Sequence, residues 1–352
     1  MIQVAINGFG RIGRAVFRLL NNMNDVKVLA VNDIADPNAL AYLLRHDTVM
    51  GPFRGNAVIE GDFMKTSYQR VKMIAEKDPC QLPWQELGVD YVIEATGRFR
   101  TRETIAQHLE AGAKKVLLTV PAKDEIDATI VMGVNEGELS AEHQIVSNAS
   151  CTTNCLAPLA YVLDKEFGIE CGLMTTVHAY TNDQRLADVP HSDWRRGRSA
   201  AENIIPTTTG AARAVGKVLK QLQGKLDGMA MRVPIPDGSI VDLVCLMRDQ
   251  VTVEGVNEAV RSAAQSPRFS KIIHYSTDPL VSSDIVGDPH SSIFDSGYTQ
   301  VVEGNMLKTL SWYDNEWGYS NRVVDLLQLM HAKQTGESDS MGASSPDEMA
   351  KK

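Results

Sequence analysis

The chain is poor in cysteine and has no excess of basic residues. It holds five cysteines in 352 residues, too few and too widely spaced for the disulfide framework of a small secreted domain. Lysine and arginine together number 35 against 44 acidic residues, and the formal net charge is −9. These shortages favour a reducing compartment, and they give no reason to expect general affinity for nucleic acid.

No apolar run approaches the roughly 20 residues that a membrane-spanning helix requires. The first residues enter a strand-like segment directly, without the basic stretch and cleavable apolar core of a secretion signal. With 43% hydrophobic residues, the chain is long enough to bury a substantial core and to divide into two domains. We therefore expect a soluble, cytoplasmic enzyme without a membrane partner.

A glycine-rich turn stands near the start of the chain. Residues 2–7 predict a strand, Gly8-Phe9-Gly10-Arg11-Ile12-Gly13 follows at once, and a helix with one apolar face is predicted after it. In a dinucleotide-binding turn such glycines allow a close approach to the pyrophosphate, and the helix N-terminus favours its charge. The alternative is a glycine-rich turn with no function.

Asp33 supports the dinucleotide interpretation. It ends the second predicted strand, 26–33, twenty residues beyond Gly13, where a carboxylate is expected to bind the adenosine ribose. The same carboxylate would repel a 2′-phosphate. We therefore expect NAD as the cofactor rather than NADP.

Strands and helices continue to alternate up to about residue 150. Asp36-Pro37 opens one helix, and another is predicted near 101–111. Further strands are predicted over 91–95, 115–119, 129–133 and 145–148. This pattern is typical of an α/β domain with a Rossmann-type doubly wound parallel sheet, here residues 1–150. Because ligands lie beyond the carboxyl ends of such strands, Thr96, Thr119 and the Cys151 turn should face the cofactor.

The pattern of predicted strands and helices changes after about residue 171. Longer strands over 173–180, 229–235 and 239–247 are separated by helices near 210–222 and 253–266. They predict a second, α+β catalytic domain, 151–315, with a mixed or largely antiparallel sheet. A C-terminal helix, 316–332, is expected to return to the first domain. The polar segment 333–352 has no apolar period and predicts a disordered tail.

Cys151 opens a predicted helix directly after Ser150, a suitable N-cap, so free N–H groups and the helix dipole would stabilise a thiolate. The thiolate is the form that attacks a carbonyl carbon. Taken alone, Cys151 also fits a small buried hydrophobe, and Cys155, one helical turn later, raises the alternative of a metal pair. No second Cys or His pair with zinc-like spacing accompanies them. We therefore expect no metal and a structural Cys155.

Two residues interrupt otherwise apolar strands. His178 would by default be a satisfied core histidine, but its pairing with Cys151 makes it a candidate base. Arg232 interrupts 229–235, and a charge in a strand fit for burial needs a partner. That partner is either a structural acid or, as we favour, a substrate phosphate.

A long polar segment, 181–209, precedes the first helix of this half. It carries four arginines, at 185, 195, 196 and 198, and ends in Thr207-Thr208-Thr209-Gly210. Long irregular loops are usually functional, and hydroxyls, a glycine turn and arginines together suit phosphate oxygens. The alternative for the arginines is a solvated or subunit-facing surface.

Four segments resemble the motifs of one enzyme family: INGFGRIGR at 6–14, SNASCTTNC at 147–155, HAYTNDQ at 178–184 and WYDNEWGY at 312–319. Over residues 2 to about 330, the chain resembles the NAD-preferring, bacterial-type phosphorylating glyceraldehyde-3-phosphate dehydrogenases. The resemblance implies oxidation of glyceraldehyde 3-phosphate with NAD and inorganic phosphate to 1,3-bisphosphoglycerate, a reaction of glycolysis and gluconeogenesis.

The resemblance also implies roles for individual residues. Cys151 would form a hemithioacetal and then a thioester, with His178 as the base. The residues implied to bind the two phosphates are Ser150, Thr153, Thr181, Asp183, Arg196, Thr209, Gly210 and Arg232. Those implied to bind NAD are Gly8, Gly10, Arg11, Ile12, Gly13, Asp33, Thr96, Gly97, Thr119, Asn315 and Tyr319. Within that set, Asn315 would bind the nicotinamide carboxamide and Tyr319 would pack beside its ring.

Segment 181–209 resembles the family's S-loop, which lies at a subunit interface, so a homotetramer is implied. Val189-Pro190 matches the NAD-preferring version of that loop. His46, Met50 and Thr119 stand where tyrosine, histidine and serine are more common in the family. None of these departures touches the catalytic pair.

Three other functions stay open on the sequence alone. Erythrose-4-phosphate dehydrogenase shares the cysteine, histidine and cofactor site, although it typically departs from the 178–183 pattern kept here. A catalytically silent NAD-binding protein is disfavoured by the intact Cys151, His178 and Arg232. Non-phosphorylating aldehyde oxidation is disfavoured because it needs no second anion site.

Overall fold

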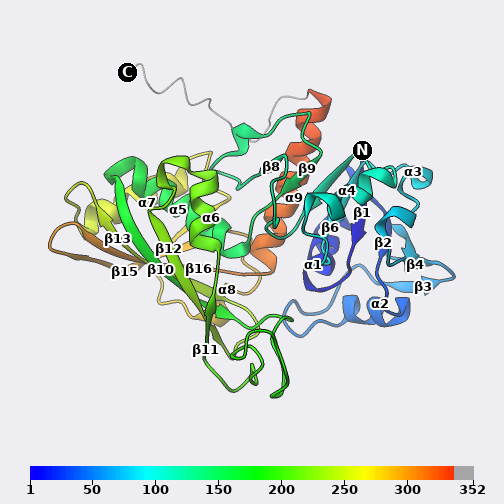
Figure 1. Ribbon diagram of the computed structural model, residues 1–352, viewed down its shortest axis with the longest axis horizontal. Helices are drawn as coiled ribbons and strands as arrows, with labels where there is room; N and C mark the ends of the chain where they lie inside the picture. The colour runs from blue at the N-terminus through cyan, green and yellow to red at the C-terminus, as the bar shows by residue number, and fades with distance from the viewer. Residues whose placement is uncertain (337–352) are drawn as a thin grey trace. The chain divides into compact units, whose positions relative to one another are not determined.

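The computed structural model describes residues 1–336. The chain forms two compact units there (Figure 1). The first comprises Met1–Ile130, Glu138–Ala149 and 320–336, and the second comprises Val131–Gly137 and Ser150–Tyr319.

The first unit is built on a nine-stranded sheet with the strand order β3-β4-β5-β2-β1-β6-β7-β9-β8. Its strands are β1 (Ile2–Asn7), β2 (Val26–Asn32), β3 (Val58–Glu60), β4 (Phe63–Lys65), β5 (Arg70–Ile74), β6 (Tyr91–Glu94), β7 (Lys115–Leu118), β8 (Ala128–Thr129) and β9 (Ile145–Ser147). The β3-β4 and β4-β5 pairs are antiparallel, and the pairs from β5 to β8 are parallel. The predicted Rossmann-type parallel sheet is therefore confirmed.

The strand predicted over 129–133 is wrong beyond Thr129. Only Ala128–Thr129 pairs with β9, and the Val131 N–H instead donates to the Asn135 Oδ1 at 2.9 Å, closing a turn. Val131 is nevertheless fully buried. Its apolar character reflects tertiary packing rather than membership of a sheet, a distinction that a short apolar run does not encode.

Four helices accompany this sheet: α1 (Arg11–Leu20), α2 (Pro37–Arg45), α3 (Trp84–Leu87) and α4 (Arg102–Glu110). Asp36 caps α2 as predicted, its carboxylate accepting from the Asn38 N–H at 2.9 Å. Helix α1 begins at Arg11; its N-cap, Gly10, makes no side-chain hydrogen bond, and its first turn holds no acid. The dipole at this end of the helix favours an anion.

The second unit has a seven-stranded sheet with the order β11-β12-β10-β13-β16-β15-β14. Its strands are β10 (Ile169–Ala179), β11 (Ile205–Thr208), β12 (Leu226–Val233), β13 (Ser239–Met247), β14 (Ile273–Ser276), β15 (Ser292–Val302) and β16 (Met306–Tyr313). The β10-β12 and β14-β15 pairs are parallel and the others antiparallel, which confirms the mixed, largely antiparallel sheet. Its helices are α5 (Cys151–Phe167), α6 (Ala211–Val218), α7 (Val253–Gln265) and α8 (Ser282–Ile285).

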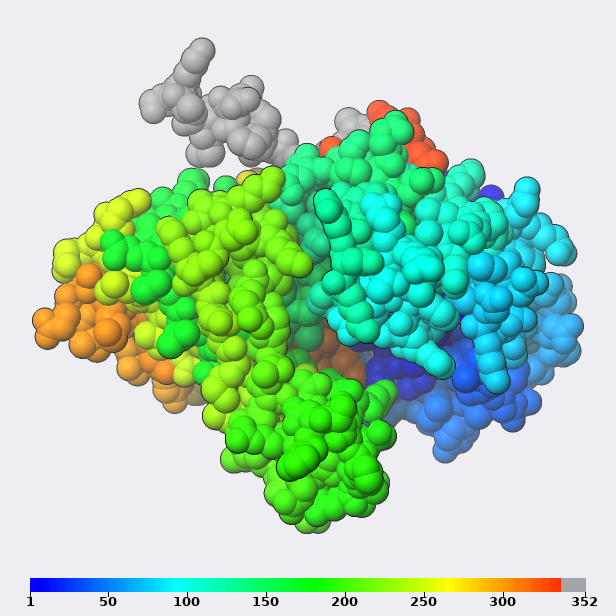
Figure 2. All heavy atoms as spheres, viewed as in Figure 1, coloured from blue at the N-terminus to red at the C-terminus, as the bar shows by residue number. Residues whose placement is uncertain are grey.

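Segment 181–209 was predicted to be irregular throughout, but part of it is regular. Its last residues form β11, which pairs antiparallel with β12 so that Ile205 lies opposite Arg232. An isolated bridge also joins Arg185 to Ser199. The rest of the segment projects from its unit as the green lobe in Figure 2.

The last helix, α9, spans Trp317–Thr335. It covers the helix predicted over 316–332 and continues three residues into the predicted tail. Residues 337–352 of that tail lie outside the described residues. In the part of the chain that the structure describes, no helix is both long enough and apolar enough to cross a membrane.

Candidate active site and cofactor site

The Cys151 thiol stands at the first residue of α5. Ser150 caps this helix as predicted, since its Oγ accepts from the Thr153 N–H at 3.1 Å. Ala149 has a φ of +54°, which non-glycine residues rarely adopt, and this conformation turns the chain sharply into the helix. The Cys151 Sγ lies 3.6 Å from the His178 Nε2, within reach of proton transfer.

Burial governs the protonation of this pair. It lowers the pKa of His178 to about 3, with the positive charge of Arg232 acting in the same direction. Burial also raises the pKa of Cys151, although Arg232 and hydrogen bonds with Thr152 oppose the rise. Burial therefore acts against the thiolate that the helix N-terminus favours.

Arg232 contacts the other side of the imidazole ring. Its Nη1 lies 2.5 Å from the His178 Nδ1 and 3.1 Å from the Ala179 carbonyl oxygen. Its Nε is buried and has no hydrogen-bond partner among the described residues. The guanidinium thus faces a ring nitrogen and a carbonyl rather than a structural acid, and an unused buried donor favours an anionic ligand. The His178 Nδ1 also lies 2.7 Å from the Ala179 carbonyl oxygen. A hydrogen on Nδ1 donates to that oxygen and leaves Nε2 as the acceptor that faces Cys151.

Two helix N-termini converge next to Cys151. The Ser150 Oγ and Thr153 Oγ1, at the start of α5, lie 2.7 Å apart. Thr153 Oγ1 also donates to the Ala211 carbonyl, at the start of α6, over 3.4 Å. Helix α6 has Gly210 as its N-cap, and the Thr209 Oγ1 accepts from the Ala211 N–H at 3.2 Å. The four residues predicted to bind inorganic phosphate are thus brought together around backbone N–H groups.

The remaining predicted substrate residues lie on segment 181–209. Arg196 pairs with Asp183 over 2.5 Å and donates from Nε to the Thr207 Oγ1 at 2.8 Å. Asp183 therefore orients an arginine; its own carboxylate would repel a phosphate. The Thr181 N–H donates to the Gln184 Oε1 at 3.2 Å, which shapes the turn that follows β10.

The glycine turn of the first unit leaves room for a pyrophosphate. A Cβ on Gly8, whose φ is +95°, would lie 2.6 Å from the Thr96 nitrogen, and one on Gly13 would lie 2.0 Å from the Gly8 oxygen. Gly10, in contrast, faces open space. Asp33 Oδ2 accepts from the Phe9 N–H at 2.7 Å. Asp33, the carboxylate predicted to bind the adenosine ribose, is therefore also held to the glycine turn by this hydrogen bond.

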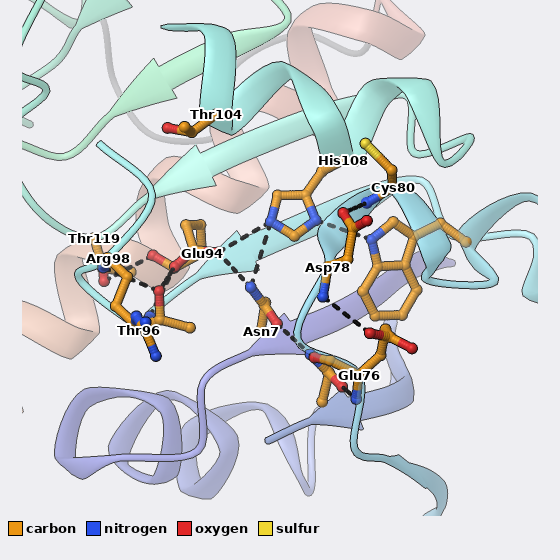
Figure 3. Close-up of polar contacts among 12 residues, drawn as sticks. Asn7, Glu76, Asp78, Cys80, Glu94, Thr96, Arg98, Thr104, His108 and Thr119 are labelled. Carbon is orange, nitrogen blue, oxygen red and sulfur yellow. Dashed lines mark hydrogen bonds and ion pairs between the residues drawn. The ribbon is translucent and has the colours of Figure 1, made fainter. Parts of the chain in front are cut away.

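A buried network supports the neighbouring Thr96 turn (Figure 3). Glu94, at the end of β6, accepts from the Thr96 N–H at 2.8 Å and from the Asn7 Nδ2 at 2.6 Å. His108 Nε2 lies 3.0 Å from the same carboxylate. Thr119 adds a hydrogen bond from its Oγ1 to the Glu94 carbonyl at 3.0 Å. Thr96 and Thr119 thus share one anchoring residue, and Gly97, at φ +68°, completes the turn.

The other predicted cofactor residues fall in both units. In the first, Arg11 makes an ion pair of 2.5 Å with Asp47, and Ile12 is half-buried in α1. In the second, the Asn315 Oδ1 accepts from the Ser239 Oγ at 2.5 Å, which leaves its Nδ2 donors for a ligand carbonyl. Tyr319 is buried near the start of α9.

Sequence reasoning missed several residues that support these sites. Glu94 interrupts the apolar strand 91–95, so the argument applied to Arg232 could have identified it. Asp237 and Asp314 lie in turns whose composition resembles that of ordinary loops, and Ser239 is the first residue of β13. Local sequence gives no comparable signal for these three.

One group of residues could hold a cation. His274, Asp288 and His290 place their ligand atoms within 4.8 Å of one another. His290 Nδ1 lies 2.7 Å from the Asp288 Oδ1, so the pair already satisfies itself as a hydrogen-bonded contact. None of the three belongs to the predicted site.

A parallel sheet with a dinucleotide turn, and a second unit with a cysteine–histidine pair beside anion-binding groups, define the class: an NAD-binding oxidoreductase. The NAD binding domain of glyceraldehyde 3-phosphate dehydrogenase matches residues 2–102, and the C-terminal domain of the same family matches residues 150–315.

Curated relatives align over nearly their whole length. The glyceraldehyde-3-phosphate dehydrogenase of Streptomyces coelicolor is 55% identical over 327 residues, covering 92% of this chain and 97% of the relative. Those of Priestia megaterium and Geobacillus stearothermophilus are each 54% identical over 333 residues, covering 94% of this chain and 99% of each relative. The chain belongs to the glyceraldehyde-3-phosphate dehydrogenase family. It is an enzyme with that activity, and NAD is its cofactor.

Proposed function

We propose that Cys151 is the nucleophile and His178 the base in the oxidation and phosphorylation of glyceraldehyde 3-phosphate. The observation that carries this proposal is the 3.6 Å approach of Cys151 Sγ to His178 Nε2, beside two helix N-termini and Arg232. A nucleophile and base within hydrogen-bond reach, with the base oriented by a third group, are the recurring features of covalent catalysis.

The first step moves one proton and forms one bond. His178 Nε2 takes the thiol proton while sulfur attacks the aldehyde carbon, and the carbonyl electron pair moves to oxygen. The protonated imidazole then returns the proton to that oxygen and completes the hemithioacetal. Because Arg232 lowers the pKa of His178, a substrate phosphate that neutralises Arg232 would make this proton transfer easier. Substrate binding and base activation are thereby linked.

Oxidation and release follow at the same sulfur. His178 takes back the hydroxyl proton as the carbon loses a hydride, and the hemithioacetal becomes a thioester. NAD, when bound, supplies the hydride acceptor. A phosphate oxygen then attacks the thioester carbon, the C–S bond breaks, and Cys151 leaves as a thiolate with the acyl phosphate as product. The thioester conserves the oxidation energy that direct hydrolysis would lose.

We assign the two anions to separate groups of residues. The substrate phosphate is held by Thr181 and Arg232, with Arg196 oriented nearby by Asp183. Inorganic phosphate is held by Ser150, Thr153, Thr209 and Gly210, where the dipoles at the N-termini of α5 and α6 favour negative charge.

The assigned NAD ligands follow the glycine turn and its neighbours. They are Gly8, Gly10, Arg11, Ile12, Gly13, Asp33, Thr96, Gly97, Thr119, Asn315 and Tyr319. The tight approach of Gly8 and Gly13 to neighbouring backbone supports the pyrophosphate assignment. The Nδ2 of Asn315 supports the carboxamide assignment, because its Oδ1 is already engaged by Ser239.

We further propose a homotetramer located in the cytoplasm. Segment 181–209 exposes Leu186 by 83% and Trp194 by 88%, large apolar surfaces that a neighbouring subunit would cover. Light scattering of the purified chain tests the assembly, and Trp194→Ser should shift it toward smaller species. A wild-type protein that is monomeric at all concentrations would contradict the tetramer.

The decisive activity test compares kcat/KM for glyceraldehyde 3-phosphate and erythrose 4-phosphate, with NAD and saturating inorganic phosphate. A large preference for the triose supports the proposal. A preference for the tetrose would reassign the substrate. Turnover independent of phosphate would contradict the proposed binding site for inorganic phosphate.

A further inference from the structure

Two buried carboxylates, outside the groups that touch substrate, lie side by side next to Asn315. Asp237, in the turn between β12 and β13, is 2% exposed, and Asp314, between β16 and α9, is 1% exposed. The Asp237 Oδ1 accepts from the N–H of Asn315, the residue directly after Asp314, so the two carboxyl groups meet at this turn. Neither oxygen of a carboxylate can donate, so a contact between two of them requires a proton.

Burial raises the pKa of Asp314, and the hydrogen bonds to its carboxylate oppose that rise. Its Oδ1 accepts from the backbone N–H groups of Glu316 at 2.8 Å and Trp317 at 2.6 Å. Its Oδ2 accepts from the Gly287 N–H at 2.7 Å. Three backbone donors to one carboxylate favour its charged form.

Only one of the two carboxylate oxygens of Asp237 accepts hydrogen bonds from the described residues. Its Oδ1 accepts from the N–H groups of Gly238 at 2.8 Å and Asn315 at 3.2 Å. Its Oδ2 is buried and receives no hydrogen bond from the described residues. An unsatisfied buried acceptor is destabilising. A proton on Oδ2 converts it into a donor to Asp314 and removes that cost.

The charges around Asp237 act in the same direction. Burial raises the pKa of Asp237 to about 9, and Asp314 and Glu316 contribute to the rise. Cys151, from α5, is the other titratable group near it. From α8, Ser282 packs against Gly238, while the Asp284 carboxylate is engaged by the Val281 N–H at 2.8 Å.

We propose that Asp237 is a positioning residue that shares a proton with Asp314 and thereby aims the Asn315 amide at the nicotinamide carboxamide. The proton joins the β12–β13 turn to the turn that starts α9. Asn315 is held between them by its N–H to Asp237 and by Ser239 Oγ to its Oδ1. Loss of the proton would set two negative charges against each other and release this turn. The inference rests on the proposed role of Asn315.

The test compares Asp237→Asn with Asp237→Ala. Asparagine keeps an acceptor for Gly238 and Asn315 and supplies a permanent donor to Asp314, whereas alanine removes both. Asp249→Asn, an acid on the surface, is the matched control. The readouts are the NADH dissociation constant by calorimetry from pH 7 to 10, the split between KM for NAD and kcat, and the infrared band of a protonated carboxylic acid.

We expect wild type and the Asp249 control to lose NADH affinity as pH rises through about 9. Asp237→Asn should keep its affinity over that range and lack the carboxylic acid band. Asp237→Ala should bind roughly tenfold more weakly at neutral pH, the loss of about one buried hydrogen bond. Its effect should fall on KM more than on kcat.

Two results would overturn the inference. One is an alkaline loss of affinity in Asp237→Asn equal to that of wild type. The other is the absence of any carboxylic acid band that depends on Asp237, a measurement that needs no activity and that survives if Asp237→Ala fails to fold. Failure of the proposed function itself would look different, because wild type would then form no NADH from the triose phosphate.

Discussion

Arg232 and His178 occupy opposite positions in the parallel pairing of β12 with β10, and the Arg232 Nη1 lies 2.5 Å from the His178 Nδ1. The other ring nitrogen, Nε2, faces the Cys151 sulfur. The strand register therefore places the guanidinium of Arg232 against the imidazole ring of His178. In the proposed mechanism, Arg232 thus affects both the binding of the substrate phosphate and the proton affinity of His178.

The dual position of Arg232 predicts a substrate-dependent defect. Arg232→Leu should raise KM for glyceraldehyde 3-phosphate by roughly 30- to 150-fold, because a hydrogen bond to a charged group contributes about 2–3 kcal/mol. Glyceraldehyde without phosphate should lose much less, and steady-state kinetics with both aldehydes measures the contrast. Equal losses with the two substrates would show that Arg232 does not bind the phosphate.

Loss of the base should slow chemistry and not binding. His178→Asn should lower kcat by roughly 10²–10⁴-fold, the usual contribution of a positioned base, and Cys151→Ala should abolish NADH formation. Iodoacetamide labelling of Cys151 should slow in the histidine variant. Cys171→Ser, which removes an exposed thiol, controls for labelling elsewhere. Unchanged kcat in His178→Asn would exclude it as the base.

Stability should depend on pH through His178. The pKa of this residue is lowered to about 3 in the folded chain, whereas an unfolded histidine titrates near 6.5. Below about pH 6.5 the unfolded state therefore binds a proton that the folded state does not, and the free energy of unfolding falls as pH falls. The slope is at most about 1.4 kcal/mol per pH unit.

Denaturant unfolding of wild type and His178→Asn between pH 7 and 5 measures this slope. The variant should show a shallower decline, because it has no group to protonate there. Parallel curves for the two proteins would mean that His178 is not the titrating group.

Asp33 should control the choice between NAD and NADP. Asp33→Asn keeps an oxygen for the Phe9 N–H, bonded at 2.7 Å, but removes the charge that repels a 2′-phosphate. We expect kcat/KM for NADP to rise at least about tenfold, since like-charge juxtaposition costs several kcal/mol. Asp36→Asn, three positions on, retains a good N-cap and should leave the cofactor ratio unchanged. An unaltered ratio in Asp33→Asn would assign the discrimination to other residues.

The sequence was sufficient where function depends on contiguous segments. The glycine turn, the Ser150 cap and the mixed second sheet were all predicted from periodicity and turn residues. Pairings between distant segments were less accessible. The residues of β11 were placed in a loop because only alignment with β12 reveals the strand, and the short β3–β5 ribbon was not predicted.

The effect of burial on Cys151 and His178 could not be predicted from the sequence. The dipole argument at Cys151 was local, whereas desolvation depends on everything packed around the sulfur. The same holds for Asp237, whose environment is set by Asp314, remote in the sequence. Buried polar groups acquire their properties from tertiary contacts, and sequence patterns record only that a polar residue sits among apolar ones.

Glu94 is a polar residue buried among apolar ones, and its hydrogen bonds hold the Thr96 turn in place. Trp84 Nε1 donates to the His108 Nδ1 at 3.1 Å, which places the imidazole hydrogen on Nε2, facing Glu94. With Asn7 and Thr96, the carboxylate thus receives donors on both oxygens (Figure 3). Glu94→Gln turns one acceptor into a donor that faces other donors, and it should lower the free energy of unfolding by about 1–3 kcal/mol.

The same variant should bind NAD more weakly, because the Thr96 turn loses its anchor, whereas the reactivity of Cys151 toward iodoacetamide should not change. Glu110→Gln, an exposed acid on α4, is the matched control for loss of a carboxylate. Denaturant unfolding and calorimetric titration with NAD measure the two effects. A destabilised Glu94→Gln with wild-type NAD affinity would restrict the network to a structural role and separate it from the cofactor site.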